Sequence, residues 1–380
     1  MKYSKPTPPD LPVEVRLSAF ERENAGEYHL IMEGNDMLLC AEAQYANIEK
    51  ALKHLTENIL PADAVPVLKR WLVSDAVNHE TLLKRVNGAA ATSVVQQPPL
   101  SGAKVALWAW FVQGAQLSRT GENSVAMRRS ACRHLFDMQM HSHGRDEFAQ
   151  TEEIFENYTG RLRAEGCTLA DNALRTWIFV QGVDTHYADM VKARKLHFYG
   201  QGLTEHTHYI ASTGIEGKYI HPETTVLMDA YAVDGLVEGQ VAYLKGAGHL
   251  NPTHEYGVTF ERATAVDYGD RRHIFVSGTA SIDNRGNILH PLDIRGQTER
   301  TLENVGVLLA EGGARTDDIA QMIVYLRDTA DYRTVAALLG ARCPDIPKVI
   351  VWAPVCRPGW LVEIECIAVC AAENRQYAPF

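Results

Sequence analysis

The sequence predicts an α+β protein built from three tandem copies of one unit. The first observation is element order: two strands, a helix, a strand, a helix and two strands can be assigned three times along the 380 residues. The second observation is spacing, since 65, 76 and 65 positions separate Asn47 from Val112, Asn157 from Val233 and Asn304 from Val369. Similar order and spacing favour an internal repeat over the alternative, one large α/β domain whose elements coincide by chance.

The first copy is expected over residues 13–117, after a proline-rich lead-in. Its predicted strands are 27–34, 37–44, 69–74, 94–97 and 104–112, and its predicted helices are 47–55 and 79–88. The second copy is expected over residues 124–234. Its predicted strands are 124–130, 135–142, 175–181, 208–213 and 224–233, and its predicted helices are 148–166 and 187–203. The polar or glycine-rich stretches 118–123 and 235–257 are predicted to connect the copies.

The third copy, expected over residues 258–372, has the clearest pattern. A strand at 271–282 precedes a helix from about Ile294, whose apolar residues Leu302, Val305, Leu308 and Leu309 share one face. Two glycines at 312–313 end this helix. Strand 321–326, a helix with Thr329 as its N-cap, and strands 348–356 and 361–369 follow.

The last strand carries two acidic side chains on one face. Because side chains alternate along a strand, Glu363 and Glu365 point the same way, among apolar neighbours. Pro358 and Gly359 suit the centre of a type II turn. If that turn closes a hairpin, Cys356 lies roughly 7–8 Å from Glu363 on the same face. The sequence therefore predicts a carboxyl and a thiol within reach of one small ligand.

The repeat also predicts how the copies assemble. Each predicted sheet has one face covered by its own helices and a second apolar face that must be buried. Three copies on one chain can bury these faces as an intramolecular pseudo-trimer, so we expect a monomer or a weak oligomer. Of the three clefts between copies, one is expected to be equipped, because Ala106 and Leu227 stand where the third copy has Glu363.

Composition excludes several classes of function. The formal net charge is −10 and no basic block occurs, which argues against a nucleic-acid partner. No apolar run reaches the roughly 18 residues of a membrane span, so no membrane partner is expected. The N-terminus has no apolar signal-peptide core. The seven cysteines are scattered without a CxxC motif, which favours reduced thiols and a cytoplasmic location.

Three motifs of the third copy, SGTAS at 277–281, QTERTLENV at 297–305 and LVEIECIAV at 361–369, resemble the YjgF/Rid superfamily, also called endoribonuclease L-PSP. Within it, TFERATAV at 259–266, SGTASIDNRGNILHP at 277–291 and VCRPGWLVEIE at 355–365 are most similar to chorismatases, which remove the enolpyruvyl group of chorismate. The resemblance covers the third copy. It implies a Rid-like (chorismate-mutase-like) fold for each unit, with two degenerate units and one that keeps the catalytic glutamate.

The resemblance implies Glu363 as the catalytic residue, and burial in an apolar cleft would raise its pKa and suit it to general acid work. Glu365 is expected to be its structural partner. Cys356 lies seven positions before Glu363. In this spacing the chain resembles the chorismatases that form 3-hydroxybenzoate, which implies a catalytic role for Cys356. The alternative for Cys356 is an inert buried thiol.

A substrate with carboxylates requires cations, for which we consider Arg327 first and then Lys348, fifteen positions before Glu363. Further candidates are Arg357, Lys192, Arg194 and Lys195. Resemblance to a chorismatase ATGIG-like motif implies that the second copy lines the site with Tyr209, Ser212, Thr213 and Gly214. Gly278 and Thr279 either donate backbone N–H groups to a ligand or allow two strands to approach closely.

These residues lead to three functional hypotheses. The first is a chorismatase-like enzyme that releases pyruvate from chorismate and leaves a hydroxybenzoate or a dihydroxycyclohexadiene acid. The second is a Rid-type deaminase of 2-imino or enamine acids, in which Lys348 holds the carboxylate and Glu363 positions water. The third is a non-catalytic protein that binds a small acid. No cofactor is expected, because no GxGxxG or P-loop motif is present, and the absence of GxSxG argues against serine-hydrolase chemistry. The pairs His141/His143 and His206/His208 lack a third ligand at an obvious spacing, so no metal is expected.

Overall fold

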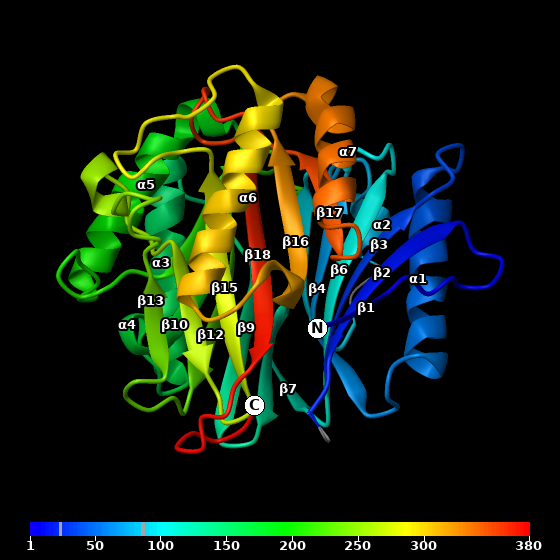
Figure 1. The fold of residues 1–380 in the computed structure, drawn as a ribbon, viewed down its shortest axis with the longest axis horizontal. Helices are drawn as coiled ribbons and strands as arrows, with labels where there is room; N and C mark the ends of the chain where they lie inside the picture. Colours follow the sequence, from blue (N-terminus) through cyan, green and yellow to red (C-terminus); the bar gives the residue numbers. More distant parts are fainter. Residues whose placement is uncertain (23–24, 85–87) are drawn as a thin grey trace.

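The chain folds into three mixed β-sheets with helices on their outer sides (Figure 1). The computed structural model describes residues 1–22, 25–84 and 88–380, and within them each sheet has six strands. Strand order is the same three times: β1-β2-β3-β6-β4-β5, then β7-β8-β9-β12-β10-β11, then β13-β14-β15-β18-β16-β17. In each sheet the last two strands are parallel and the other pairs are antiparallel. The predicted α+β fold of three like units is confirmed.

The elements of unit 1 are β1 (Lys2–Ser4), β2 (Val13–Phe20), β3 (Glu27–Gly34), α1 (Ala41–Asn58), β4 (Ala64–Val73), α2 (Glu80–Leu83), β5 (Ala91–Gln96) and β6 (Val105–Gln113). Those of unit 2 are β7 (Gln116–Gly121), β8 (Ser124–Arg129), β9 (Cys132–Met140), α3 (Glu147–Ala164), α4 (Leu169–Asn172), β10 (Ala173–Val180), α5 (Val183–Gly200), β11 (Ala211–Glu216) and β12 (Val226–Asp234).

The elements of unit 3 are β13 (Val241–Leu244), β14 (Ala263–Asp267), β15 (Arg271–Ala280), α6 (Ile294–Glu311), β16 (Ile319–Leu326), α7 (Tyr332–Arg342), β17 (Lys348–Trp352) and β18 (Val362–Ala371). Short 3₁₀ turns span Thr253–Tyr256, Thr316–Asp318 and Thr329–Asp331. Helices α6 and α7 cover the outer face of this sheet (Figure 1).

The inner faces of the three sheets meet in one shared core. Trp108 of β6 and Trp177 of β10 pack with their ring centroids 6.0 Å apart, and both belong to a cluster that includes Tyr325 of β16. Because this apolar core takes side chains from all three units, each unit buries its second sheet face against the other two.

A buried ion pair joins each pair of units. The nitrogen–oxygen distances are 2.7, 2.7 and 2.8 Å for Arg70–Asp229, Arg175–Glu365 and Arg271–Glu27 respectively. Removing one partner of such a pair costs about 3–5 kcal/mol, since the remaining charge stays buried without its counter-ion. The pairs therefore favour this docking of the three units over alternative arrangements.

Three expectations about local structure are wrong. Residues 37–44 are not a strand, because 37–39 form a turn and α1 begins at Ala41; the helix formers Ala, Glu and Gln prevail there. The strands that precede α1 in unit 1 are instead β1, β2 and β3. The connectors 118–123 and 235–257 contain β7 and β13, which extend the second and third sheets at their edges. Residues 85–87 of the predicted helix 79–88 lie outside the described residues.

The expected hairpin before the last strand is also wrong. Strand β16 lies between β17 and β18, so the chain crosses over it and the two strands do not pair. A turn does close at Pro358 and Gly359, with the Trp360 N–H donating to the Arg357 carbonyl at 3.0 Å. Gly359 lacks the positive φ that a type II turn requires at this position. Before α7, Asp328 rather than Thr329 caps the 3₁₀ turn.

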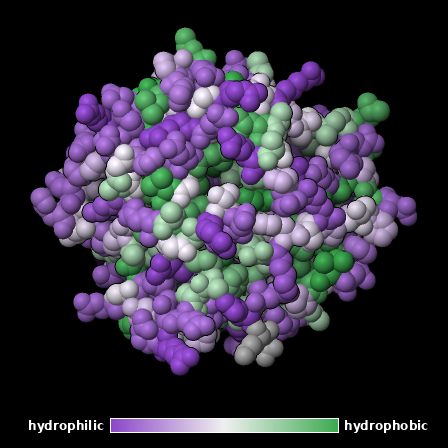
Figure 2. Space-filling model, viewed as in Figure 1, coloured by the Kyte–Doolittle hydropathy of each residue, from purple (hydrophilic) through white to green (hydrophobic). Residues whose placement is uncertain are grey.

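The surface seen in Figure 2 is mainly hydrophilic, with small hydrophobic areas scattered over it. None of the described helices is both long enough and apolar enough to cross a membrane. Among the described residues, the most exposed large apolar side chains are Leu38 and Leu292, which lie in different units.

Candidate active site

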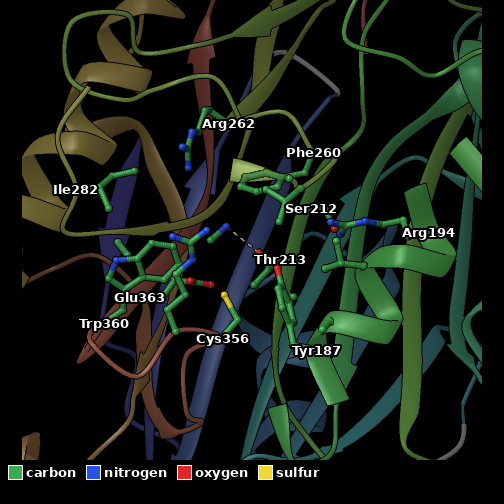
Figure 3. Close-up of a pocket in the computed structure, with 18 residues that line it drawn as sticks. Tyr187, Arg194, Ser212, Thr213, Phe260, Arg262, Ile282, Cys356, Trp360 and Glu363 are labelled. Carbon is green, nitrogen blue, oxygen red and sulfur yellow. Dashed lines mark hydrogen bonds between the residues drawn. The ribbon is translucent and has the colours of Figure 1, made fainter. Parts of the chain in front are cut away.

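A cavity of about 300 Å³ lies between unit 2 and unit 3. One wall comes from unit 2, with Tyr187 and Arg194 on α5 and Ser212, Thr213 and Gly214 on β11. The other wall comes from unit 3, with Gly278 and Ala280 on β15, Glu363 on β18, and Arg262, Cys356, Arg357 and Trp360 on loops (Figure 3). The cavity thus joins residues far apart in the chain.

Glu363 is the acidic residue of the cavity wall. It is the second residue of β18, has Ala280 of β15 and Tyr325 of β16 as cross-strand neighbours, and is 4% exposed. Burial raises the pKa of its carboxyl to about 8, and repulsion from Glu365 adds to this, while Arg175 and Arg262 oppose it. The carboxyl therefore holds a proton near neutral pH and can donate it.

The same strand position in the other two units has no acid. Glu363, Ala106 and Leu227 are the second residues of β18, β6 and β12, respectively. Each lies opposite the penultimate residue of an antiparallel neighbour, which is β16, β4 and β10, respectively. The predicted correspondence of these three residues is confirmed by this register. Ala106 and Leu227 are fully buried apolar residues.

Glu365 lies behind the cavity rather than in its wall. Its carboxylate accepts hydrogen bonds from Arg175 at 2.7 Å and from the Trp177 indole at 2.8 Å. The same Arg175 nitrogen lies 2.5 Å from the Thr213 hydroxyl. Glu365 therefore acts on Glu363 through charge and holds β11 in place through Arg175 and Thr213.

Gly278 allows the Glu363 carboxyl to lie against β15. A Cβ atom at this position would be 2.0 Å from Glu363 Oε1, well inside van der Waals contact. Its backbone N–H donates to the Thr213 hydroxyl at 2.9 Å, the contact dashed in Figure 3. Of the two roles considered for Gly278, close approach is the one the geometry supports, since its N–H already has a protein partner.

Gly278→Ala is expected to reduce any activity that uses Glu363 by at least about 10²-fold, because the added methyl displaces the acid from its position. Overpacking should also lower stability by about 1–3 kcal/mol. Gly160→Ala in α3 is the control, since its Cβ would meet nothing within 4 Å. Turnover and thermal melting of both variants check this; full activity of Gly278→Ala would contradict the proposed position of the acid.

Cys356 reaches the cavity and hydrogen-bonds to the Tyr187 side chain. Burial raises the pKa of its thiol to about 12, with a further contribution from Glu363. The sulfur is therefore a thiol at neutral pH, whereas a cysteine nucleophile acts as the thiolate. Cys356 can serve as a proton donor or a packing group beside Glu363.

Three arginines line the cavity and make it suitable for an anion. Arg194 on α5 is 1% exposed, and its Nε donates to the Thr259 hydroxyl at 3.2 Å. Arg262 donates to the Asn251 carbonyl at 2.9 Å and approaches the cavity from the other side (Figure 3). Arg357 stacks on Trp360 with a distance of 5.0 Å to the ring centroid. Guanidinium groups bind carboxylates in a bidentate manner, so a ligand with one or two carboxylates fits.

Several predicted site residues lie elsewhere. The Arg327 guanidinium pairs with Asp184 at 2.8 Å, and Lys348 donates to the Cys343 carbonyl at 2.6 Å; neither lines this cavity. Tyr209 and Thr279 do not line it either: Tyr209 faces a neighbouring pocket, and the Thr279 hydroxyl donates to the Ser277 carbonyl at 2.9 Å.

The geometry brings together Glu363, Cys356, Ser212, Thr213, Gly214 and Gly278 of the predicted set. Tyr187, Arg262 and Trp360 also line the cavity and were not predicted from the sequence. Arg262 lies within the TFERATAV motif and Trp360 within VCRPGWLVEIE, so both motifs contained the signal. Tyr187 had no such signal, because its place depends on how unit 2 docks on unit 3.

Residues 261–370 match the family model of endoribonuclease L-PSP. The match lies within unit 3 and covers less than half of the chain. Residues of this chain are 39% identical over 59 residues to a RutC family protein of Pyrococcus abyssi. They are 27% identical over 97 residues to the 3-aminoacrylate deaminase RutC of Acinetobacter baylyi.

These matches cover 16% and 25% of this chain, and 46% and 77% of the two relatives. The chain thus spans about half the length of the first relative. A crystal structure of a chorismatase is similar over 80% of this chain and 92% of its own, with 20% identity and a TM-score of 0.63. The fold of this chain is therefore similar to that of a chorismatase.

Proposed function

We propose that this protein is a chorismatase-like enzyme that releases the enolpyruvyl group of chorismate as pyruvate. The observation that carries the proposal is a buried, protonated carboxyl in a cavity lined by three arginines. Chorismate has two carboxylates and an enol ether, and the cavity offers cations for the former and an acid for the latter. The likeness to a chorismatase fold supports the same substrate class.

In this proposal Glu363 protonates the methylene carbon of the enolpyruvyl group, which leaves a cation stabilised by the ether oxygen. If water adds to the cationic carbon beside the ether oxygen, a hemiketal forms. It collapses to pyruvate and a dihydroxycyclohexadiene acid, and one water is consumed. If instead the bond between the ring carbon and the ether oxygen breaks, pyruvate leaves with that oxygen, and loss of a proton from the ring cation gives a hydroxybenzoate without net water. Proton transfer from a placed acid contributes about 10²–10⁴-fold.

The arginines supply the remainder of the catalysis in this proposal. Arg194, Arg262 and Arg357 hold the two carboxylates so that the methylene faces Glu363, which lowers the entropy cost of the proton transfer. The Cys356 thiol and the Tyr187 hydroxyl form a hydrogen-bonded pair beside the acid. That pair is placed to relay the proton that the ring loses on the aromatising route.

Incubation with chorismate should release pyruvate, with a rate that is constant at low pH and falls as the pH rises through about 8. This direction follows because the acid form of Glu363 is the active one and is lost above its pKa. Coupled pyruvate detection measures the rate, and chromatography of the second product separates the two routes. A rate that increases through this pH range would contradict general acid catalysis by Glu363.

The RutC similarity favours one second candidate, deamination of a 2-imino or enamine acid. The role first given to Lys348 does not fit, because its ammonium lies outside the cavity. An arginine of the cavity would hold the carboxylate instead, and Glu363 would position water. Ammonia release from 2-aminoacrylate without pyruvate release from chorismate would favour this candidate, and binding without either reaction would indicate a non-catalytic protein.

A further inference from the structure

A second cavity of about 300 Å³ lies between unit 3 and unit 1. In the candidate active site, helix α5 and the parallel edge strand β11 of unit 2 face strands β15 and β18 of unit 3. In the second cavity, the corresponding elements of unit 3, α7 and β17, face unit 1. Tyr332 and Ala336 come from α7 and Ile350 from β17. The second cavity is therefore the counterpart of the candidate active site at the next junction between units.

This second cavity also contains a glutamate, on a different strand. Glu33 of β3 lies directly opposite Ala106 of β6, and Ala106 is the counterpart of Glu363. Glu33 itself corresponds to Ala280, which lies opposite Glu363. In unit 1 the acidic residue therefore lies on the neighbouring strand, and it still lines a cleft between units. The expectation that one cleft alone is equipped is corrected here, because it compared only the last strand of each unit.

Glu33 is half-buried, whereas Glu363 is buried, but the pKa of the Glu33 carboxyl is shifted in the same direction. Burial raises the pKa of its carboxyl to about 7; a hydrogen bond from Ser101 and the charge of Arg16 oppose this, and Glu14 adds to it. The Ser101 hydroxyl donates to Glu33 Oε1 at 2.9 Å. The titratable and charged groups around it are Glu14 and Arg16 from β2, Lys5 from the N-terminal segment, Tyr332 from α7 and Lys348 from β17.

Two cations are held in fixed positions at this cavity. The Lys348 ammonium donates to the carbonyls of Cys343 at 2.6 Å and Ile346 at 3.3 Å. An ammonium has three N–H donors, so one is left for a ligand. Arg16 is oriented by Glu14 at 2.7 Å and by the Lys348 carbonyl at 3.2 Å. Burial lowers the pKa of the Lys348 ammonium, and among the described residues Lys348 forms no salt bridge with a carboxylate. The charge of Asp345 opposes this shift, but Asp345 itself pairs with Lys5 at 3.5 Å.

We propose that this cavity is a second binding site, which takes a small 2-oxo or 2-hydroxy monocarboxylic acid. Its carboxylate would lie between Lys348 and Arg16, and its neighbouring oxygen would accept a hydrogen bond from the Glu33 carboxyl. Lys348 and Arg16 together match one carboxylate, whereas three arginines line the candidate active site. This site goes beyond the proposed function, because binding here requires no turnover of chorismate.

Pyruvate is the probe, and its binding to the full chain is measured by calorimetry and by line broadening of ¹³C-labelled pyruvate. Lys348→Met should weaken one class of sites at least about 10-fold, while Arg262→Gln, the matched change in the other cavity, should leave that class intact. The affinity of wild type at this class should fall as the pH rises through about 7, because ionised Glu33 repels the carboxylate. Glu33→Gln should remove this pH dependence.

Ala336→Met, which fills the cavity without changing its charge, gives a second test if Lys348→Met folds poorly. Loss of pyruvate binding in Ala336→Met, with melting like wild type, supports the site. Pyruvate binding that survives both changes, or that is absent from wild type at millimolar concentration, overturns the proposal. The chorismate assay is independent of this result, so failure of the proposed function and failure of this inference can be distinguished.

Discussion

Glu363→Gln is expected to abolish pyruvate release and also to make the protein more stable at alkaline pH. The amide cannot protonate the substrate, so the rate should fall by about 10²–10⁴-fold or more. The pKa of Glu363 is about 8 in the folded protein and ordinary in the unfolded chain. Wild type therefore loses stability as the pH rises from about 4.5 to about 8, and the loss remains above that, because folding must then bury an ionised carboxylate.

The variant lacks this penalty, so the difference in free energy of unfolding should be near zero at pH 4 and on the order of a few kcal/mol at pH 9. Thermal denaturation of both proteins at pH 4, 7 and 9 measures the difference and cancels the titration of all other groups. Glu153→Gln, an exposed change on α3, is the control and should show no such trend. A constant difference at every pH would mean that Glu363 is not a buried, protonated acid.

The threefold repeat could be recognised from the sequence because it rests on local patterns repeated at similar spacing. Strands such as β3 and β18 are mostly apolar, and α1, α3 and α6 show one buried face. The edge strands β7 and β13 could not be recognised in this way. They are short and mostly exposed, so their strand conformation depends on pairing with β8 and β14 rather than on their own composition.

The candidate site was predictable where one strand carried it. Glu363 and Glu365 share a face by alternation alone, and the structure places them there. The cations were harder, because a sequence does not show which arginine of one unit faces the cleft of another. Lys348 has the spacing from Glu363 that is expected of a substrate cation. However, β17 lies beyond β16 at the edge of the sheet, so Lys348 lines the cleft with unit 1. The same strand order explains why the hairpin between β17 and β18 does not form.

Glu365→Gln is expected to shift the alkaline limb of the pH–rate profile to lower pH and to destabilise the fold. Repulsion from Glu365 is the second cause of the raised pKa of Glu363, so its removal lets Glu363 ionise more readily. The same change leaves the buried Arg175 guanidinium without its carboxylate partner, which costs about 3–5 kcal/mol. Rate measurements from pH 5 to 10 and denaturant unfolding give the two quantities.

The matched control lies at the junction of units 1 and 2. Asp229 is the fourth residue of β12 as Glu365 is of β18, and it pairs with Arg70 at 2.7 Å in equal burial. Asp229→Asn should therefore cost a similar free energy of unfolding but leave the pH–rate profile unchanged, because Asp229 does not contribute to the pKa of Glu363. If both variants shift the profile equally, the shift reflects a loosened fold, and Glu365 does not tune the acid through its charge.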